Sequence, residues 1–139
     1  MIKKIFLYTF LFFGLTQIYG QKKSAFLQAA DEAFAYKNYY GALKFYNEAL
    51  EFDEKDADVL YKSAESARLF NSYKIAAEKY SYLIDTLQIV NDSSTLYYAG
   101  EMYQRLGQYD KATEYYDLYL TQYNKDGDYL TTKAKKDKE

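Results

Sequence analysis

Four residue types are missing from this sequence of 139 residues: cysteine, histidine, proline and tryptophan. Without cysteine the chain can form no disulfide, no thiolate metal site and no lipid-anchored cysteine. Without histidine and cysteine it also lacks the commonest zinc ligands and the usual nucleophile–base pairs. The lack of proline suits an almost wholly helical chain, because proline interrupts helices. We therefore predict a non-catalytic protein with no metal site and no cofactor.

The chain also lacks a strong excess of charge of either sign. Its net charge is −2, and Lys3 and Lys4 lie in a segment that we expect to be removed, which leaves 16 basic and 20 acidic residues, a balance of −4. Nucleic acids are bound by neutralising phosphates, so this balance argues against a nucleic-acid partner. We interpret the one basic cluster as a solvated helix end or linker; it consists of Lys133, Lys135, Lys136 and Lys138. Nothing in the sequence indicates a small-molecule substrate.

Tyrosine, by contrast, is abundant, with 19 copies, and much of it recurs at a fixed period. Residues 39–53 have the apolar spacing of an amphipathic helix, with Ala42, Tyr46 and Ala49 on one face. Similar stretches begin at residues 73 and 109, and the alanines at positions 42, 76 and 112 recur at an interval of roughly 35 residues. A repeat of this period predicts an array of helix pairs.

We divide residues 21–126 into three units of one domain, at about 23–56, 57–90 and 93–126. Residues 127–139 follow as a polar C-terminal helix or linker. Asn38, Asp56 and Asp92 (or Ser93) precede predicted helices and are suitable N-caps. The predicted helices span residues 24–36, 39–52, 57–70, 73 to about 87, about 93–106, 109–123 and 129–138. For the fourth of them we expect a buried face of Ile75, Ala76, Tyr80, Leu83 and Ile84.

Small residues recur within both helices of each unit, and aromatic residues recur around them. The small residues are Ala30, Ala64 and Gly100 in the first helices and Ala42, Ala76 and Ala112 in the second. The tyrosines are Tyr39, Tyr73 and Tyr109, which open the second helices, and Tyr46, Tyr80 and Tyr116, four residues after each alanine. In this pattern the units resemble tetratricopeptide repeats. They depart from it at Leu83 and Tyr119, where the family favours a third small residue. The resemblance implies an all-α fold, a right-handed α-solenoid of three helix pairs plus a C-terminal helix.

In tetratricopeptide-repeat proteins the first helices of the pairs line a concave groove that binds a protein or peptide. The resemblance implies groove positions at Leu27, Gln28, Asp31, Phe34, Tyr61, Lys62, Glu65, Arg68, Tyr97, Tyr98, Glu101, Gln104 and Arg105. The alternative is that Tyr61, Tyr97 and Tyr98 are packing residues whose hydroxyls reach solvent. One family variant grips a C-terminal carboxylate with asparagine, lysine and arginine. This chain has acidic residues where that clamp has asparagine, so we do not expect such a ligand. We expect reversal of the charges of Glu65 and Glu101 to weaken partner binding without unfolding the chain.

Residues 1–20 have the pattern of a secretory signal peptide. Lys3 and Lys4 precede an apolar run that spans positions 5–15, and Gly20 is a small residue at the predicted cleavage point before Gln21. The run is shorter than the roughly 20 residues that span a bilayer, although an uncleaved inner-membrane anchor is the alternative. We therefore expect an exported protein, periplasmic or outer-membrane-associated on the periplasmic side.

The export segment and the lysine-rich residues 129–136 give the chain a second resemblance. It looks like the N-terminal repeat region of Bacteroidetes outer-membrane proteins in which tetratricopeptide repeats precede a β-propeller and an OmpA-like domain. This likeness implies a protein–protein interaction scaffold in an outer-membrane, secretion or gliding assembly. Two alternatives stay open: a self-associating adaptor, and a regulatory module of a larger envelope protein or enzyme of which this chain is a fragment. The oligomeric state and the partner's identity stay open too.

Overall fold

The computed structural model describes residues 21–90, 92–125 and 127–138, so the predicted signal peptide lies outside the described residues. Within these ranges every regular element is a helix, as predicted. Residues 21–35 are helical and are called here the first helix. The elements after it are α2 (Tyr39–Leu50), α3 (Ala57–Leu69), α4 (Tyr73–Ser81), the π-helix η1 (Tyr82–Thr86), α5 (Ser93–Arg105), α6 (Tyr109–Tyr123) and α7 (Tyr129–Lys138).

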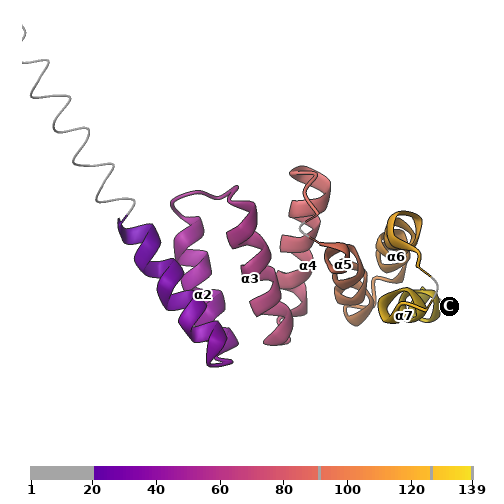
Figure 1. The fold of residues 1–139 in the computed structure, drawn as a ribbon, viewed down its shortest axis with the longest axis horizontal. Coiled ribbons are helices and arrows are strands. Elements are labelled where there is room, and N and C mark those ends of the chain that lie inside the picture. Colours follow the sequence, from indigo (N-terminus) through magenta and orange to yellow (C-terminus); the bar gives the residue numbers. More distant parts are fainter. Residues whose placement is uncertain (1–20, 91, 126, 139) are drawn as a thin grey trace, which may run out of the picture.

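The helices lie side by side in a single row, in the order of the sequence (Figure 1). Each of α2 to α6 packs against the next helix in the chain, and α7 packs against both α6 and α5. The first helix, α3 and α5 are the first helices of the three units, and α2, α4 and α6 are their partners. This arrangement is the predicted all-α solenoid.

Side-chain caps begin several of the helices, as the sequence predicts. Asn38 accepts a hydrogen bond from the backbone N–H of Gly41 at 3.0 Å, and Asp56 accepts one from Val59 at 3.2 Å. Asp92 caps α5 through a capping box. Each cap satisfies a backbone donor that has no partner within its own helix. The polar residues between the units therefore fix where the first helices of the second and third units begin.

The turn within each helix pair uses a residue in the left-handed region at the same repeat position. These residues are Lys37 with φ 59°, Asn71 with φ 62° and Gly107 with φ 71°. Left-handed backbone costs a residue with a Cβ about 1–2 kcal/mol and costs glycine little. The three turns are thus alike in shape, although a glycine occupies the position in the third unit alone.

The prediction was wrong in part for the second helix of the second unit. The α-helix α4 gives way to the π-helix η1 at residue 82, where the sequence predicted one continuous α-helix. Ile75 was expected to be buried but is 39% exposed, because the buried face of α4 falls on Ala76, Ala77 and Tyr80. Leu83, in η1, is fully buried where the first unit has the smaller Ala49.

The core runs along the row of helices and is rich in alanine and tyrosine. The six small residues that mark the repeats are all buried, and so are the tyrosines at positions 46, 80 and 116. Small residues allow helix backbones to approach closely, and the aromatic rings fill the space beside each close approach. The packing that the repeat pattern implies is therefore present in all three units.

The C-terminal helix continues the repeat. Ala134 on α7 is fully buried and lies one repeat period after Gly100, as Leu130 does after Leu96. Because α7 packs against α5 and α6, it occupies the place of the first helix of a fourth unit. The polar sequence of residues 127–139 predicts a helix or linker here, but not this role.

Candidate partner-binding groove

The groove positions of the first two units each hold a carboxylate that is bonded to a buried tyrosine of the paired helix. Tyr46 Oη donates to Asp31 Oδ1 at 2.5 Å, and Tyr80 Oη donates to Glu65 Oε1. The two pairs have the same spacing in the sequence. Burial, and then the neighbouring carboxylate, raise the pKa of Tyr46 and of Tyr80, so both remain protonated donors.

The third unit makes different hydrogen bonds and ion pairs from the first two. Tyr116 donates to Gln104 Oε1 at 3.2 Å, although Glu101 has the repeat position of Asp31 and Glu65. Glu101 Oε1 accepts instead from Arg105 Nη2 at 3.1 Å and lies 3.6 Å from Lys133 Nζ on α7. The carboxylate of the third unit therefore pairs with cations and attaches the C-terminal helix to α5.

Arg68 lies between α3 and α5, in the region that we call the second cleft. Its Nε and Nη2 donate to the two carboxylate oxygens of Glu65 at 3.1 and 2.6 Å. Its guanidinium carbon lies 3.8 Å from the centre of the Tyr98 ring. Burial alone would lower the pKa of Arg68, but the hydrogen bonds and charge of Glu65 outweigh burial and raise it. Arg68 is thus a fixed cation held between a carboxylate and an aromatic face.

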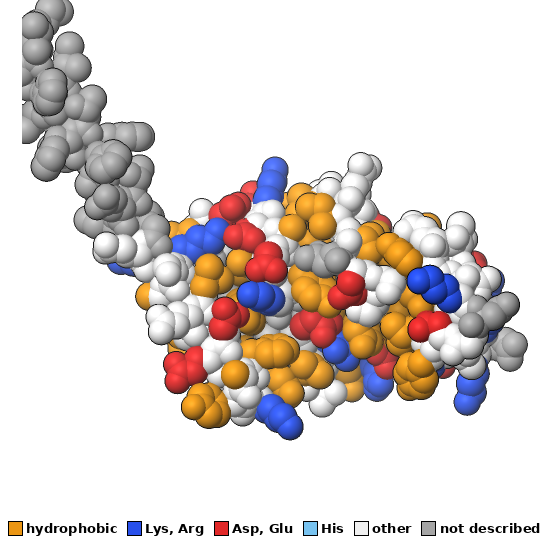
Figure 2. All heavy atoms as spheres, in the orientation of Figure 1, with side chains coloured by type: hydrophobic (Ala, Val, Ile, Leu, Met, Phe, Trp, Pro, Cys, Tyr) orange, Lys and Arg blue, Asp and Glu red, His pale blue; other side chains and the backbone are white. Residues whose placement is uncertain are grey.

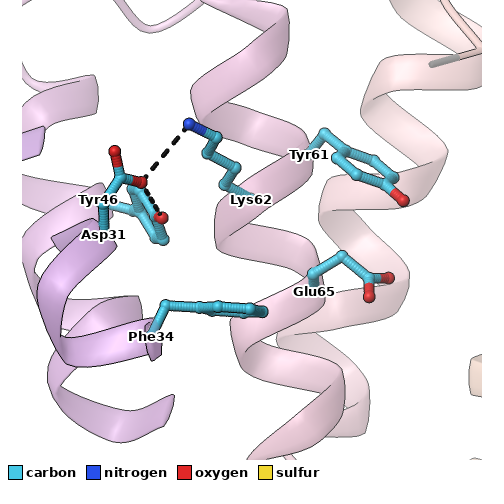
Figure 3. A pocket seen from close by; sticks show the side chains of 6 residues that line it. All are labelled: Asp31, Phe34, Tyr46, Tyr61, Lys62 and Glu65. Carbon is cyan, nitrogen blue, oxygen red and sulfur yellow. Dashed lines mark hydrogen bonds and ion pairs between the residues drawn. The ribbon is translucent and has the colours of Figure 1, made fainter. Parts of the chain in front are cut away.

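The cleft between the first helix and α3, which we call the first cleft, contains a cavity of about 310 Å³. Phe34 reaches across it from the first helix, whereas the polar ends of Tyr61 and Glu65 point away from it (Figure 3). This leaves the Phe34 ring and the stems of the α3 side chains toward the cavity, with Asp31 and Lys62 at one edge. The lining residues are Asp31, Phe34, Tyr46, Tyr61, Lys62 and Glu65.

Lys62 is shared between two carboxylates at the edge of the first cleft. Its Nζ lies 3.4 Å from Asp31 Oδ1 and 3.4 Å from Asp58 Oδ2. Burial lowers the pKa of Lys62, but the two carboxylates outweigh that effect and raise it. Exposed pairs of this kind typically contribute only about 0–1 kcal/mol, so Lys62 can move between the two partners at small cost.

The cleft between α5 and α7, which we call the third cleft, is closed by contacts within the chain. Tyr97 is fully buried and donates to Asp137 Oδ2 at 3.0 Å. Gln104 Nε2 donates to the backbone oxygen of Asp137, also at 3.0 Å. The structure therefore places Tyr97, Glu101 and Gln104 within the contact with α7 and not on an open surface.

The predicted groove residues accordingly fall into three groups. Those of the first cleft include Asp31, Phe34, Tyr61 and Lys62, and on the same helix as Asp31 the half-buried Leu27 and the exposed Gln28 lie outside the cavity lining. The second cleft holds Arg68 against Tyr98, with Glu65 between the first two clefts. The third group is closed by α7, with Arg105 at its edge, where the Arg105 guanidinium lies 5.1 Å from the centre of the Tyr73 ring.

The structure argues against the expectation that charge reversal of Glu65 and Glu101 leaves the fold intact. The side chain of Glu65 is 15% exposed and that of Glu101 is 12% exposed, and both are bonded to cations. A positive charge at either place would be mostly buried and would face the cation that the carboxylate now pairs with, which is strongly destabilising. The two residues hold helices together, whatever else they contact.

Three further residues belong to this region and were not predicted for it. Tyr46 lines the first cavity from beneath, while Lys133 and Asp137 close the third cleft from α7. The signal for the two α7 residues was the small residue Ala134, which follows Gly100 at the repeat period and places α7 beside α5. For Tyr46 the signal was its recurrence with Tyr80, a pattern that by itself indicates packing.

The face seen in Figure 2 carries side chains of both charges interspersed with apolar ones. Among the described residues, no group of three or more acidic or other ligating side chains could hold a metal ion. Within the same ranges no helix has the length and apolar character required to cross a membrane. The face shown is therefore of mixed charge, and the most exposed aromatic side chains of the described residues, such as Tyr36, Tyr109 and Tyr129, lie outside the clefts.

Comparison with known proteins bears on the repeat pattern. No family model matches the chain. A curated relative, the TPR repeat-containing protein MJ1428 of Methanocaldococcus jannaschii, is 40% identical over 84 residues, which is 58% of this chain. The chain spans 14% of the length of that relative. The likeness therefore concerns the repeats and not the whole of the larger protein.

Solved structures extend the likeness to the fold. The N-terminal domain of stress-induced protein-1 from C. elegans matches with a TM-score of 0.68 at 13% identity, over 87% of this chain and 98% of that one. The type III secretion chaperone SycD of Yersinia enterocolitica, in complex with a peptide of the translocator YopD, matches with a TM-score of 0.63 at 16% identity. That match covers 90% of this chain and 89% of SycD. The repeat pattern, the single row of helix pairs and these likenesses together show that the chain has the tetratricopeptide-repeat fold.

Proposed function

We propose that this chain is a non-catalytic protein–protein interaction scaffold that binds an extended segment of a partner protein in the first cleft. The observation that carries the proposal is the cavity of about 310 Å³ between the first helix and α3. In the second and third clefts the chain's own side chains make the contacts, whereas the first contains open volume for a partner's side chain. SycD, which has this fold, was solved with a peptide bound.

The first cleft has the composition of a peptide-binding site. Phe34 presents an aromatic ring to the cavity, and Asp31 and Lys62 provide exposed polar groups at its edge (Figure 3). Peptide grooves combine such apolar pockets, which anchor side chains, with polar groups that fix orientation. The exposed Gln28 lies one turn before Asp31 and can reach the backbone of a bound segment.

The test is selection of peptides from a random display library on the purified chain. Binding of the selected peptides should fall at least about tenfold in Phe34→Ala, because the aromatic wall of the cavity is removed. Tyr36→Ala is the matched control, since Tyr36 lies two residues away, is highly exposed and is outside the cavity lining. Circular dichroism on both variants checks that they are folded. Equal binding by the wild type and Phe34→Ala would show that the partner binds to another surface.

The finer part of the proposal concerns location: export to the cell envelope, in an outer-membrane, secretion or gliding assembly. It rests on the pattern of residues 1–20 and is tested by immunoblot of fractionated native cells with an antibody against residues 57–124. A periplasmic or outer-membrane band supports export, and a cytoplasmic band contradicts it. The size of the band distinguishes a free adaptor from a module of a larger envelope protein or enzyme. Cross-linking of the same fractions distinguishes self-association from binding of another protein.

A further inference from the structure

The second cleft shows which side chain this architecture holds between two neighbouring first helices. Arg68 lies there with its guanidinium against the Tyr98 ring at 3.8 Å and is bonded through two nitrogens to Glu65. Tyr80 holds the same carboxylate from beneath. An arginine between a carboxylate and an aromatic face gains both charge-assisted hydrogen bonds and cation–π attraction.

The first cleft keeps part of this arrangement, but neither the arginine nor the tyrosine: Lys62 has the repeat position of Tyr98. Asp31 and Tyr46 occupy the positions that Glu65 and Tyr80 have in the second unit, and they make the same hydrogen bond. At the position of Arg68 the first unit has Phe34. The first cleft therefore keeps the bonded carboxylate and carries its aromatic ring, Phe34, on the first helix, with a cavity of about 310 Å³ beside them and Lys62 at its edge.

Resting on the proposed function, we infer that the first cleft takes an arginine side chain of the partner. Its aliphatic stem would pack on Phe34 and its guanidinium would pair with Asp31, as Arg68 pairs with Glu65. The volume of about 310 Å³ is at the lower end of the range of about 300–1,000 Å³ typical of ligand sites, and is suited to one long side chain. Half of the Asp31 side chain is exposed, so an incoming group can reach it.

Lys62 decides whether a basic side chain is admitted, since it is a cation at the edge of the same cavity. It is equidistant from Asp31 and Asp58, at 3.4 Å from each, so it can pair with Asp58 alone and leave Asp31 to the guanidinium. The inference thus gives Lys62 a specific role, that of a competitor for Asp31. An acidic partner would instead use Lys62 as its binding group, and an apolar partner would be indifferent to both charges.

The experiment is titration of the full chain, labelled with ¹⁵N, with N-acetyl-arginine amide, followed by amide chemical shifts. The expected result is saturable binding with a Kd on the order of 1–10 mM, appropriate to a single side chain, with shifts centred on Asp31, Phe34 and Lys62. N-acetyl-citrulline amide has nearly the same shape without the charge and should bind at least about fivefold more weakly. N-acetyl-norleucine amide and N-acetyl-glutamate amide represent the apolar and acidic partners.

Variants with unchanged backbone sharpen the test. Asp31→Asn still accepts from Tyr46 but loses the charge, and should weaken arginine binding about fivefold or more. Lys62→Met keeps the stem and removes the competing cation, and should strengthen binding about threefold. Asp110→Asn, an exposed carboxylate of the third unit, is the matched control and should bind as the wild type does.

The outcomes separate this inference from the proposed function. Norleucine amide binding as tightly as arginine amide, preference for glutamate amide, weaker binding by Lys62→Met, or no saturable shift up to about 100 mM would each overturn it. If the display selection yields peptides that depend on Phe34 but carry no arginine, the proposed function is supported and the inference of an arginine ligand is contradicted. If the selection yields arginine-containing peptides whose binding depends on Asp31, the proposed function and the arginine inference are both supported.

Discussion

The first two units and the third use one repeat pattern but make different hydrogen bonds with it. In the first and second units the buried tyrosine of the second helix donates to a carboxylate on the first helix of the same pair. In the third unit Tyr116 donates to Gln104 instead. All three tyrosines are essentially fully buried, so the difference lies in where the ring points and not in how deeply it is packed.

The residue beneath the ring explains the difference. The first two units have Ala30 and Ala64 at the close approach of the helices, whereas the third has Gly100. A Cβ built at Gly100 would lie 2.7 Å from Cδ1 and Cε1 of Tyr116, closer than atoms pack. The Tyr116 ring occupies the space that a methyl group would fill, and its hydroxyl does not bond to Glu101. Glu101 pairs instead with Arg105 and with Lys133, which is on α7. The missing methyl group at Gly100 thus accompanies the change of hydrogen-bond partner in the unit to which the C-terminal helix is attached.

The largest expected effect comes from restoring that methyl group. Gly100→Ala should lower the free energy of unfolding by about 2 kcal/mol, although alanine is the better helix former by about 1 kcal/mol, because the added Cβ displaces the Tyr116 ring. Urea denaturation followed by circular dichroism measures it. Ala64→Gly, the reverse change in the second unit, should cost about 1 kcal/mol through helix propensity and lost packing.

A second variant tests whether the Tyr116 ring causes the loss of stability in Gly100→Ala. If Gly100→Ala is destabilised by the ring, replacement of Tyr116 by leucine in the same chain should remove part of the loss, so that the two changes together cost less than their sum. A Gly100→Ala chain as stable as the wild type would mean that the ring has room to move. The contrast between the units would then have another cause.

A smaller effect distinguishes the first unit from the second. Tyr80→Phe should cost about 1–2 kcal/mol, since it removes a donor from Glu65, whose side chain is mostly buried. Tyr46→Phe should cost about 0.5 kcal/mol, because the Asp31 side chain is 54% exposed and water can replace the lost hydroxyl. Thermal denaturation of the two variants compares them directly. Equal losses would show that the exposure of the carboxylate does not set the strength of these bonds.

Much of the fold could be predicted because three units repeat the same evidence. The bounds predicted for α6 and α7 agree with the structure, and the caps Asn38, Asp56 and Asp92 lie where the sequence places them. Each of these features depends on residues close together in the chain, where helix periodicity and capping are strong signals. Agreement among the units then makes each signal more secure.

The division of the groove into three different clefts could not be predicted in the same way. Whether Arg68 lies against Tyr98 depends on the rotamers of two side chains that come from different helices. The burial of Tyr97 depends on α7, whose polar sequence gives a weak amphipathic signal. Ile75 was misplaced because α4 buries two adjacent alanines, which shifts its apolar face away from the isoleucine. In each case tertiary packing determined the position of the side chain, and the spacing of residues in the sequence gives no information about that packing.

The smallest of the expected effects concerns the turn of each unit. The left-handed position is Gly107 in the third unit, with nothing within 4 Å of a built Cβ, but Lys37 in the first. Lys37→Gly should therefore raise the free energy of unfolding by about 0.5–1 kcal/mol, and Gly107→Ala should lower it by about 1 kcal/mol, both through backbone strain alone. Asn71→Gly should change little, because asparagine tolerates this conformation and its Oδ1 accepts a hydrogen bond from Tyr73. Thermal denaturation of the three variants gives the order, and a Lys37→Gly chain no more stable than the wild type would mean that the first turn relaxes its strain in a way that the third cannot.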